Sequence, residues 1–179
     1  MALSISLTAC GGGDADNKQN AGASSSAPGD EKPKDGAESG GTTVPDTSQT
    51  LATINGTNGF QVLIHTAVRD EGGFLTVTGT VKNTDSKNQQ VPLQWNGQES
   101  QIKGKGRSFA GITLVDKAEK KRYYVLRDTD ANPLTTTGIS RMDGGSSVTF
   151  FAQFPAPPSS TTQVDIQIPV MPTATIEIS

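Results

Sequence analysis

The sequence predicts an all-β domain, an antiparallel immunoglobulin-like β-sandwich of seven or eight strands, preceded by a disordered N-terminal tether. Apolar and polar residues alternate with a period of two through most of the chain after residue 50, as in strands that bury one face. Clusters of Gly, Pro, Asn and Asp separate these runs, and no amphipathic helical stretch of useful length interrupts them. Many short strands joined by such turns are typical of a sandwich.

The tether is indicated by a change of composition. Residues 11–50 contain eight glycines, no aromatic residue and only one large aliphatic residue, Val44. Such a segment buries too little apolar surface to offset the entropy it would lose on folding. We therefore expect a disordered linker over residues 11–50, with seven acidic residues and three lysines, and a folded domain over residues 51–179.

The domain contains all nine aromatic residues, so the hydrophobic core must form there. When the linker's charges are subtracted from the totals of 18 acidic and 15 basic residues, 11 acidic and 12 basic residues remain. A net charge of +1 does not create the one-signed field expected of a nucleic-acid-binding protein. About 129 residues suffice for a core that needs neither a disulfide nor a metal.

The expected strands follow one another at short intervals. The clearest is residues 75–82, where odd positions are apolar or small and even positions are polar. The others have the same alternation, and cover residues 62–68, 91–95, 109–115, 122–127, 148–154, 164–168 and 174–178. Turn-forming residues separate them at residues 70–73, 83–86, 96–97, 104–106, 128–133, 143–145 and 155–158.

Trp95 is the only tryptophan. The pair of cysteines that flanks the core tryptophan of antibody domains is absent, because the chain has a single Cys. We expect Trp95 to lie in the core, with an exposed, partner-binding tryptophan as the alternative.

The single cysteine ends the sequence Leu7-Thr8-Ala9-Cys10 and precedes the glycines at the start of the linker. This pattern resembles a lipobox, which implies cleavage before Cys10 and a diacylglycerol on its sulfur. Two acyl chains are enough for stable membrane attachment. Residues 1–9 contain no Lys or Arg and are short for a secretory signal, so we expect residues 1–10 to be the remnant of a longer signal peptide. The alternative is a free thiol near the N-terminus of a cytosolic protein.

A family resemblance covers most of residues 60–178. Residues 61–83 resemble the opening hairpin of immunoglobulin-like domains of unknown function in lipoproteins of Gram-positive cell envelopes. Further segments resemble the same family, namely residues 111–116, 121–128, 154–158 and 164–169. The resemblance implies the fold and an envelope location. Some members continue into an OmpA-type peptidoglycan-binding domain, but nothing in these residues supports wall binding directly.

Two sites for enzymatic or metal chemistry can be considered. His65 is the only histidine, yet no nucleophile motif accompanies it, and we expect a strand residue that faces either solvent or a satisfied partner. Asp128, Asp130 and Asn132 have the alternating oxygen spacing of a calcium loop. Pro133 occupies the position where that loop needs glycine, so an EF-hand is excluded; we expect an ordinary Asx turn, which is far commoner after a strand, with an irregular calcium site as the alternative.

A group of basic residues could contact anionic lipids or wall polymers, although a hairpin turn with exposed lysines is the ordinary explanation and the one we expect. The group comprises Lys103, Lys105, Arg107, Lys117, Lys120, Lys121 and Arg122.

These observations lead us to expect a non-enzymatic binding or accessory module on the extracytoplasmic face of the cell membrane, without a cofactor. Its expected contacts are the membrane, through lipid on Cys10, and a protein or wall component of the envelope, but not nucleic acid. The second hypothesis is a calcium-dependent or hydrolytic envelope protein that uses His65 or the turn at residues 128–132. A purely structural spacer is the third.

Overall fold

Strands dominate the part of the chain that the computed structural model describes, residues 47–179. Residues 1–10 with Cys10, and the linker up to residue 46, lie outside the described residues. In chain order the elements are β1 (Ala52–Asn55), β2 (Phe60–Arg69), β3 (Phe74–Asn83), β4 (Gln89–Gln90), the 3-10 helix η1 (Leu93–Asn96), α1 (Ser100–Lys103), β5 (Thr113–Asp116), β6 (Lys121–Tyr124), β7 (Arg141–Met142), β8 (Ser147–Pro155), β9 (Gln163–Gln167) and β10 (Ala174–Glu177).

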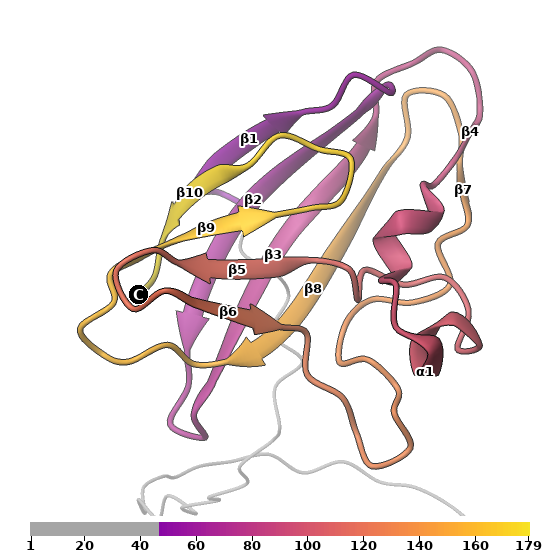
Figure 1. The fold of residues 1–179 in the computed structure, drawn as a ribbon. Coiled ribbons are helices and arrows are strands. Elements are labelled where there is room, and N and C mark those ends of the chain that lie inside the picture. Colours follow the sequence, from indigo (N-terminus) through magenta and orange to yellow (C-terminus); the bar gives the residue numbers. More distant parts are fainter. Residues whose placement is uncertain (1–46) are drawn as a thin grey trace, which may run out of the picture. The chain divides into compact units, whose positions relative to one another are not determined.

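Two four-stranded antiparallel sheets pack face to face (Figure 1). The first has the order β1-β2-β3-β8 and the second the order β10-β9-β5-β6. In immunoglobulin domains strand B lies between A and E, and strand F lies between C and G. Here β3 lies between β2 and β8, and β9 lies between β5 and β10, so the topology is the same. The predicted immunoglobulin-like sandwich is confirmed, and the third sheet of the described residues is only the short pair β4-β7.

The inward faces of both sheets form one hydrophobic core. Leu75 and Val77 of β3 are fully buried, as are Leu114 of β5 and Ile166 of β9. These residues occupy alternate positions along their strands, which is the pattern from which the strands were predicted. Trp95 is also completely buried, so its predicted place in the core is confirmed.

Trp95 holds one end of the core through aromatic packing. Its ring lies 5.3 Å from that of Phe60 and 5.5 Å from that of Phe109, and Phe109 continues to Phe150 at 5.0 Å. Edge-on and tilted contacts of this kind stabilise aromatic clusters beyond the area that they bury.

The predicted strand at residues 91–95 is wrong. Pro92 lacks an N–H group, and its carbonyl accepts a hydrogen bond of 3.1 Å from the backbone N–H of Trp95, which begins η1. The alternation of Val91, Leu93 and Trp95 resembled a strand, but Leu93 is 65% exposed while Trp95 is buried.

Two other predicted strands are shorter than expected. The strand at residues 109–115 begins only at Thr113, because Phe109–Ile112 forms a turn closed by a hydrogen bond of 3.1 Å from the Ile112 N–H to the Phe109 carbonyl. The strand at residues 122–127 ends at Tyr124, after which the chain crosses to the first sheet, where the Leu126 N–H donates to the Gln153 carbonyl at 2.8 Å. The edge strand β1 was not predicted.

The edge of β8 that faces away from β3 is covered by an irregular segment, residues 134–136. The Gln153 N–H donates to the Leu134 carbonyl at 3.0 Å, and the Thr136 N–H donates to the Phe151 carbonyl at 3.1 Å. This segment takes the place that strand D has beside strand E in immunoglobulin domains.

Neither short helix of residues 47–179 has the length and apolarity needed to cross a bilayer.

Candidate functional site

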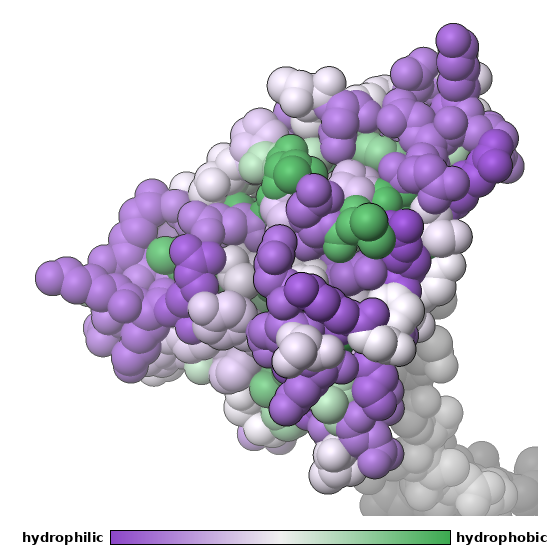
Figure 2. All heavy atoms as spheres, turned by 45° about the vertical axis from the view of Figure 1, so that its right-hand side comes forward, coloured by the Kyte–Doolittle hydropathy of each residue, from purple (hydrophilic) through white to green (hydrophobic). Residues whose placement is uncertain are grey.

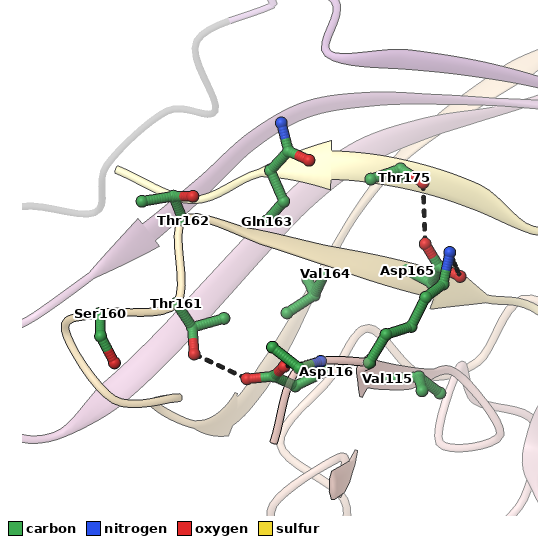
Figure 3. A pocket seen from close by; sticks show the side chains of 11 residues that line it. Val115, Asp116, Ser160, Thr161, Thr162, Gln163, Val164, Asp165 and Thr175 are labelled. Atoms are coloured by element: carbon green, nitrogen blue, oxygen red, sulfur yellow. Dashed lines mark hydrogen bonds and ion pairs between the residues drawn. The ribbon is translucent and has the colours of Figure 1, made fainter. Parts of the chain in front are cut away.

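The first candidate site is a polar cleft at the end of the second sheet where β5 and β9 part. Their pairing ends at Val115 and Asp165, and the chain on either side then diverges around a cavity of about 290 Å³. Two carboxylates, a lysine and several hydroxyl groups line it (Figure 3). Asp116 and Lys117 come from the end of β5, and Thr161 comes from the loop before β9.

Asp116 is buried and fully hydrogen-bonded. Its Oδ1 accepts bonds from the backbone N–H groups of Ala118 at 2.9 Å and Glu119 at 3.0 Å, and its Oδ2 accepts one of 2.6 Å from the Thr161 hydroxyl. Figure 3 shows Thr161 and Asp116 directed toward each other across the cleft. The Thr161 bond and then the Glu119 bond hold the pKa of Asp116 below its ordinary value of 3.8, although burial opposes them. Asp116 therefore closes the turn after β5 as a carboxylate.

Asp165 lies on the outer face of the same sheet. Its Oδ2 is 2.8 Å from the Lys117 Nζ, and its Oδ1 accepts a hydrogen bond of 2.8 Å from the Thr175 hydroxyl. Burial acts to raise the pKa of Asp165, but the hydrogen bond and charge of Lys117, together with Thr175, outweigh it and leave the pKa lowered. The Lys117 side chain is 71% exposed and that of Asp165 only 11%, so Lys117 covers the carboxylate.

The chemistry of the cleft is limited by this internal pairing. Both carboxyl groups have lowered pKa values, whereas a general acid that works near neutral pH needs a raised one. All four oxygens of the two carboxylates already accept hydrogen bonds or an ion pair. The network connects three segments of the fold and leaves Lys117 as its most exposed charged group.

His65 lies on β2 at a β-bulge. Ile64 pairs with Gly79 and Thr66 with Thr78, so His65 is the extra residue. Its Nδ1 is 2.7 Å from the Gln49 carbonyl oxygen and its Nε2 is 2.9 Å from the Thr80 hydroxyl. Because a carbonyl only accepts, Nδ1 carries a proton and donates to Gln49. Both ring nitrogens thus form hydrogen bonds, Nδ1 with the backbone of Gln49 and Nε2 with the side chain of Thr80.

The turn at Asp128 is an Asx turn closed on itself. Oδ1 of Asp128 accepts hydrogen bonds from the N–H groups of Asp130 at 3.0 Å and Asn132 at 2.7 Å, and Oδ2 accepts one of 2.9 Å from the Asn132 side chain. The Asn132 side chain, and then its backbone N–H, lower the pKa of Asp128. Among residues 47–179, no three His, Cys, Asp or Glu side chains are grouped as metal ligands.

The basic residues do not form one cluster. Lys117 pairs with Asp165, and Arg107 donates to the Val91 carbonyl at 2.8 Å. Arg122 of β6 donates through Nη1 to the Thr113 hydroxyl at 2.8 Å and to Gln167 Oε1 at 2.7 Å. Both of these hydrogen-bond acceptors of Arg122 are uncharged, whereas Lys117 pairs with a carboxylate.

A second candidate site is the groove along β6. It has a volume of about 530 Å³ and is lined by Glu99, Pro155 and residues 122–127. Arg127 forms an ion pair with Glu99 within it. Arg122 also borders a neighbouring hollow of about 300 Å³ on the outer face of the second sheet. Sequence reasoning included Arg122 in the basic group but missed its place on an edge strand, because the sheet order is not encoded in any local pattern.

The surface around these sites is mostly polar. Figure 2 shows one face of the domain, on which hydrophobic residues form separate small spots among hydrophilic ones. Among residues 47–179 the exposed large hydrophobic residues are Val68, Phe74, Leu93, Tyr124, Phe151 and Val170. Scattered single residues of this kind are normal on a protein surface.

Comparison with known proteins gives no family for this chain, since no family model and no curated protein matches it. Two solved structures are similar at low identity. A functionally unknown protein from Listeria monocytogenes EGD-e has 9% identity and a TM-score of 0.41, with 73% of this chain and 82% of that one covered. The GAE domain of GGA2p from Saccharomyces cerevisiae has 10% identity and a TM-score of 0.32, with 72% of this chain and 96% of that one covered.

Proposed function

We propose that this chain is a lipid-anchored extracytoplasmic lipoprotein whose sandwich domain is a non-enzymatic binding or accessory module of the cell envelope. The observation that carries the proposal is the sequence Leu7-Thr8-Ala9-Cys10 directly before a polar linker. The only thiol of the chain stands where a lipoprotein carries its lipid, and the linker separates that position from the folded domain.

A binding role rather than a catalytic one is supported by how the reactive side chains are used. His65 forms hydrogen bonds with Gln49 and Thr80, Asp128 accepts hydrogen bonds within its own turn, and Asp116 accepts one from Thr161 across the cleft. Each of these groups has its polar atoms engaged by the fold. A site for hydrolysis needs a group that is free to exchange a proton with a substrate.

Mass spectrometry of the mature N-terminus tests the anchor. We expect Cys10 as the first residue, carrying diacylglycerol, and membrane-associated protein after cell fractionation. The matched variant Cys10→Ser should retain residues 1–9 and carry no lipid. An unmodified thiol at Cys10, with Met1 still present and the wild-type protein in the soluble fraction, would contradict the proposal.

Cross-linking in living cells tests the binding role of the domain. The full chain should capture a partner that a chain lacking residues 51–179 does not capture. Equal capture by both chains would favour the spacer hypothesis instead.

Thermal unfolding in calcium and in EDTA tests the calcium hypothesis. We expect the same melting temperature in both, because the Asp128 oxygens are already used within the turn. A rise of several degrees in calcium that Asp128→Asn abolishes would favour a metal site.

A further inference from the structure

We propose that the free edge of β6 binds an extended segment of another polypeptide that carries acidic side chains, which adds a strand to the second sheet and places a carboxylate on Arg122. This inference deepens the proposed binding function. It rests on that proposal in one respect, namely that the domain has a binding partner. It does not depend on lipid at Cys10.

The first observation is the position of β6 at the edge of its sheet. β6 pairs with β5 on one side, and no strand of the described residues follows it in the sheet order β10-β9-β5-β6 (Figure 1). Alternate backbone N–H and C=O groups of an edge strand point away from the sheet and can pair with an added strand.

The second observation is the groove along this edge. Residues 122–127, together with Glu99 and Pro155, line a cavity of about 530 Å³. The ion pair of Arg127 with Glu99 balances the charges of those two residues. Tyr124, which is 54% exposed, contributes an aromatic side chain beside the edge. By contrast, the edge of β8 in the other sheet is already covered by residues 134–136.

The third observation is the orientation of Arg122. Its Nη1 donates to Thr113 on β5 and to Gln167 on β9, two residues that are paired across these strands. These two bonds hold the guanidinium group in place, while no carboxylate of the described residues forms an ion pair with it. A positioned guanidinium group with donors left over is suited to bind a carboxylate through charge-assisted hydrogen bonds.

Charge decides between the possible occupants of the edge. Lys120 precedes β6, and Lys121 and Arg122 begin it, so a second copy of this strand paired about these residues would bring like charges together. A basic or neutral segment would leave Arg122 without a counter-charge. An acidic extended segment satisfies both the backbone edge and the guanidinium group.

Binding of defined peptides to the full chain carrying Cys10→Ser tests the inference. The probe is a short peptide of alternating threonine and glutamate, with two controls: the same peptide with lysine in place of glutamate, and one N-methylated at alternate backbone nitrogens. We expect only the unmodified acidic peptide to bind, with backbone amide shifts in the NMR spectrum along β6 and weaker binding at higher ionic strength.

Arg122→Gln should weaken binding of the acidic peptide about tenfold or more, as expected for the loss of charge-assisted hydrogen bonds. Arg141→Gln is the matched control, because Arg141 is an exposed arginine on β7 outside the groove, and it should bind like the wild type. Thermal unfolding of both variants checks that they fold.

Several results would overturn the inference. They are no binding of the acidic peptide, equal binding by Arg122→Gln, equal binding of the N-methylated peptide, and self-association through β6 that Arg122→Glu abolishes. Displacement of the peptide by an anionic glycan with shifts confined to Arg122 would also overturn strand addition. None of these results depends on the mass measurement of the N-terminus. Failure of the strand-addition inference is therefore distinguishable from failure of the lipoprotein proposal.

Discussion

The indole Nε1–H of Trp95 donates a hydrogen bond of 2.9 Å to the carbonyl oxygen of Pro169. This bond joins η1 to the turn between β9 and β10, two segments that are far apart in the sequence. The side chain that fills one end of the core therefore also fixes the loop above it.

Replacement of Trp95 should separate these two contributions. Trp95→Phe keeps an aromatic ring but leaves the Pro169 carbonyl without its donor, so we expect a loss of about 1–3 kcal/mol in the free energy of unfolding. Trp95→Ala also creates a cavity and should cost about 3–5 kcal/mol. Urea unfolding measures both, with the exposed Leu93→Ala as a control near zero. A Trp95→Phe chain as stable as the wild type would show that the hydrogen bond contributes little.

Substitution of Gly79 should be far more costly than substitution of Gly104. A Cβ atom at Gly79 would meet the Leu63 carbonyl oxygen at 2.5 Å and the Phe150 ring at 2.6 Å, and neither the backbone nor a core ring can move away freely. We expect Gly79→Ala to destabilise by about 1–3 kcal/mol. No atom lies within 4 Å of a Cβ at Gly104, so Gly104→Ala should be neutral or stabilising by up to about 1 kcal/mol. Chemical denaturation of both variants provides the comparison, and equal effects would be evidence against the close approach at Gly79.

Acid should destabilise the domain through Asp116 and Asp165. Both have folded-state pKa values below the ordinary value of 3.8. Their stabilising contribution is therefore complete above the unfolded-state value and is lost as the pH falls through the lower, folded-state values. Unfolding free energies measured from neutral pH to about pH 2 should decrease below about pH 4. Asp116→Asn should be less stable at neutral pH and should show a shallower acid slope; an unchanged slope would exclude Asp116 as a source.

Removal of the Tyr123 hydroxyl should not destabilise the domain. This hydroxyl is buried without a hydrogen-bond partner. Tyr123→Phe removes an unsatisfied polar group, so the free energy of unfolding should stay the same or rise by about 1 kcal/mol. Tyr124→Phe, at an exposed position, is the control and should change nothing. Burial, and then the charges of Asp116 and Glu119, raise the pKa of Tyr123 above its ordinary value of 10.0. Absorbance titration of the Tyr124→Phe chain can follow this pKa. A marked loss of stability in Tyr123→Phe would indicate a partner for the hydroxyl.

His65→Ala should loosen the segment before β1. The substitution removes both hydrogen bonds of the ring, to Gln49 and to Thr80, and we expect a cost of about 1–3 kcal/mol. Hydrogen exchange should accelerate most at the Leu51 amide, which donates to the Ile64 carbonyl beside the bulge. Thr80→Val removes one of the two partners and should have a smaller effect. Unchanged exchange at Leu51 in His65→Ala would show that the ring does not hold this segment.

The long strands could be predicted because apolar and polar residues alternate along them according to the face of the sheet that each occupies. In β3 the residues Leu75, Val77 and Val81 face the core, while Thr76 and Thr78 do not, and each side chain reports which face it occupies. The alternation fails at Pro92, where the missing N–H group favours η1 over a strand. It also failed to reveal β1, whose four residues contain only one buried side chain, Ile54.

The two candidate sites could not be predicted, because each depends on which distant segments meet. Thr161 reaches Asp116 across 45 positions of the sequence, and Gln167 reaches Arg122 across the same number. No local pattern in either segment indicates the other. The turn at Asp128 was visible in the sequence because its donors and acceptors lie within a few residues, and there the sequence left two interpretations open.

The contact between His65 and Gln49 has a practical consequence for anyone who trims this protein. A version that starts at Leu51 would contain every strand, yet it would lack the carbonyl oxygen that accepts from the imidazole. The N-terminal limit of the stable unit is thus set by a side chain of the second strand rather than by the first strand itself. Fusion partners, affinity tags and protease sites should accordingly be joined ahead of Gln49.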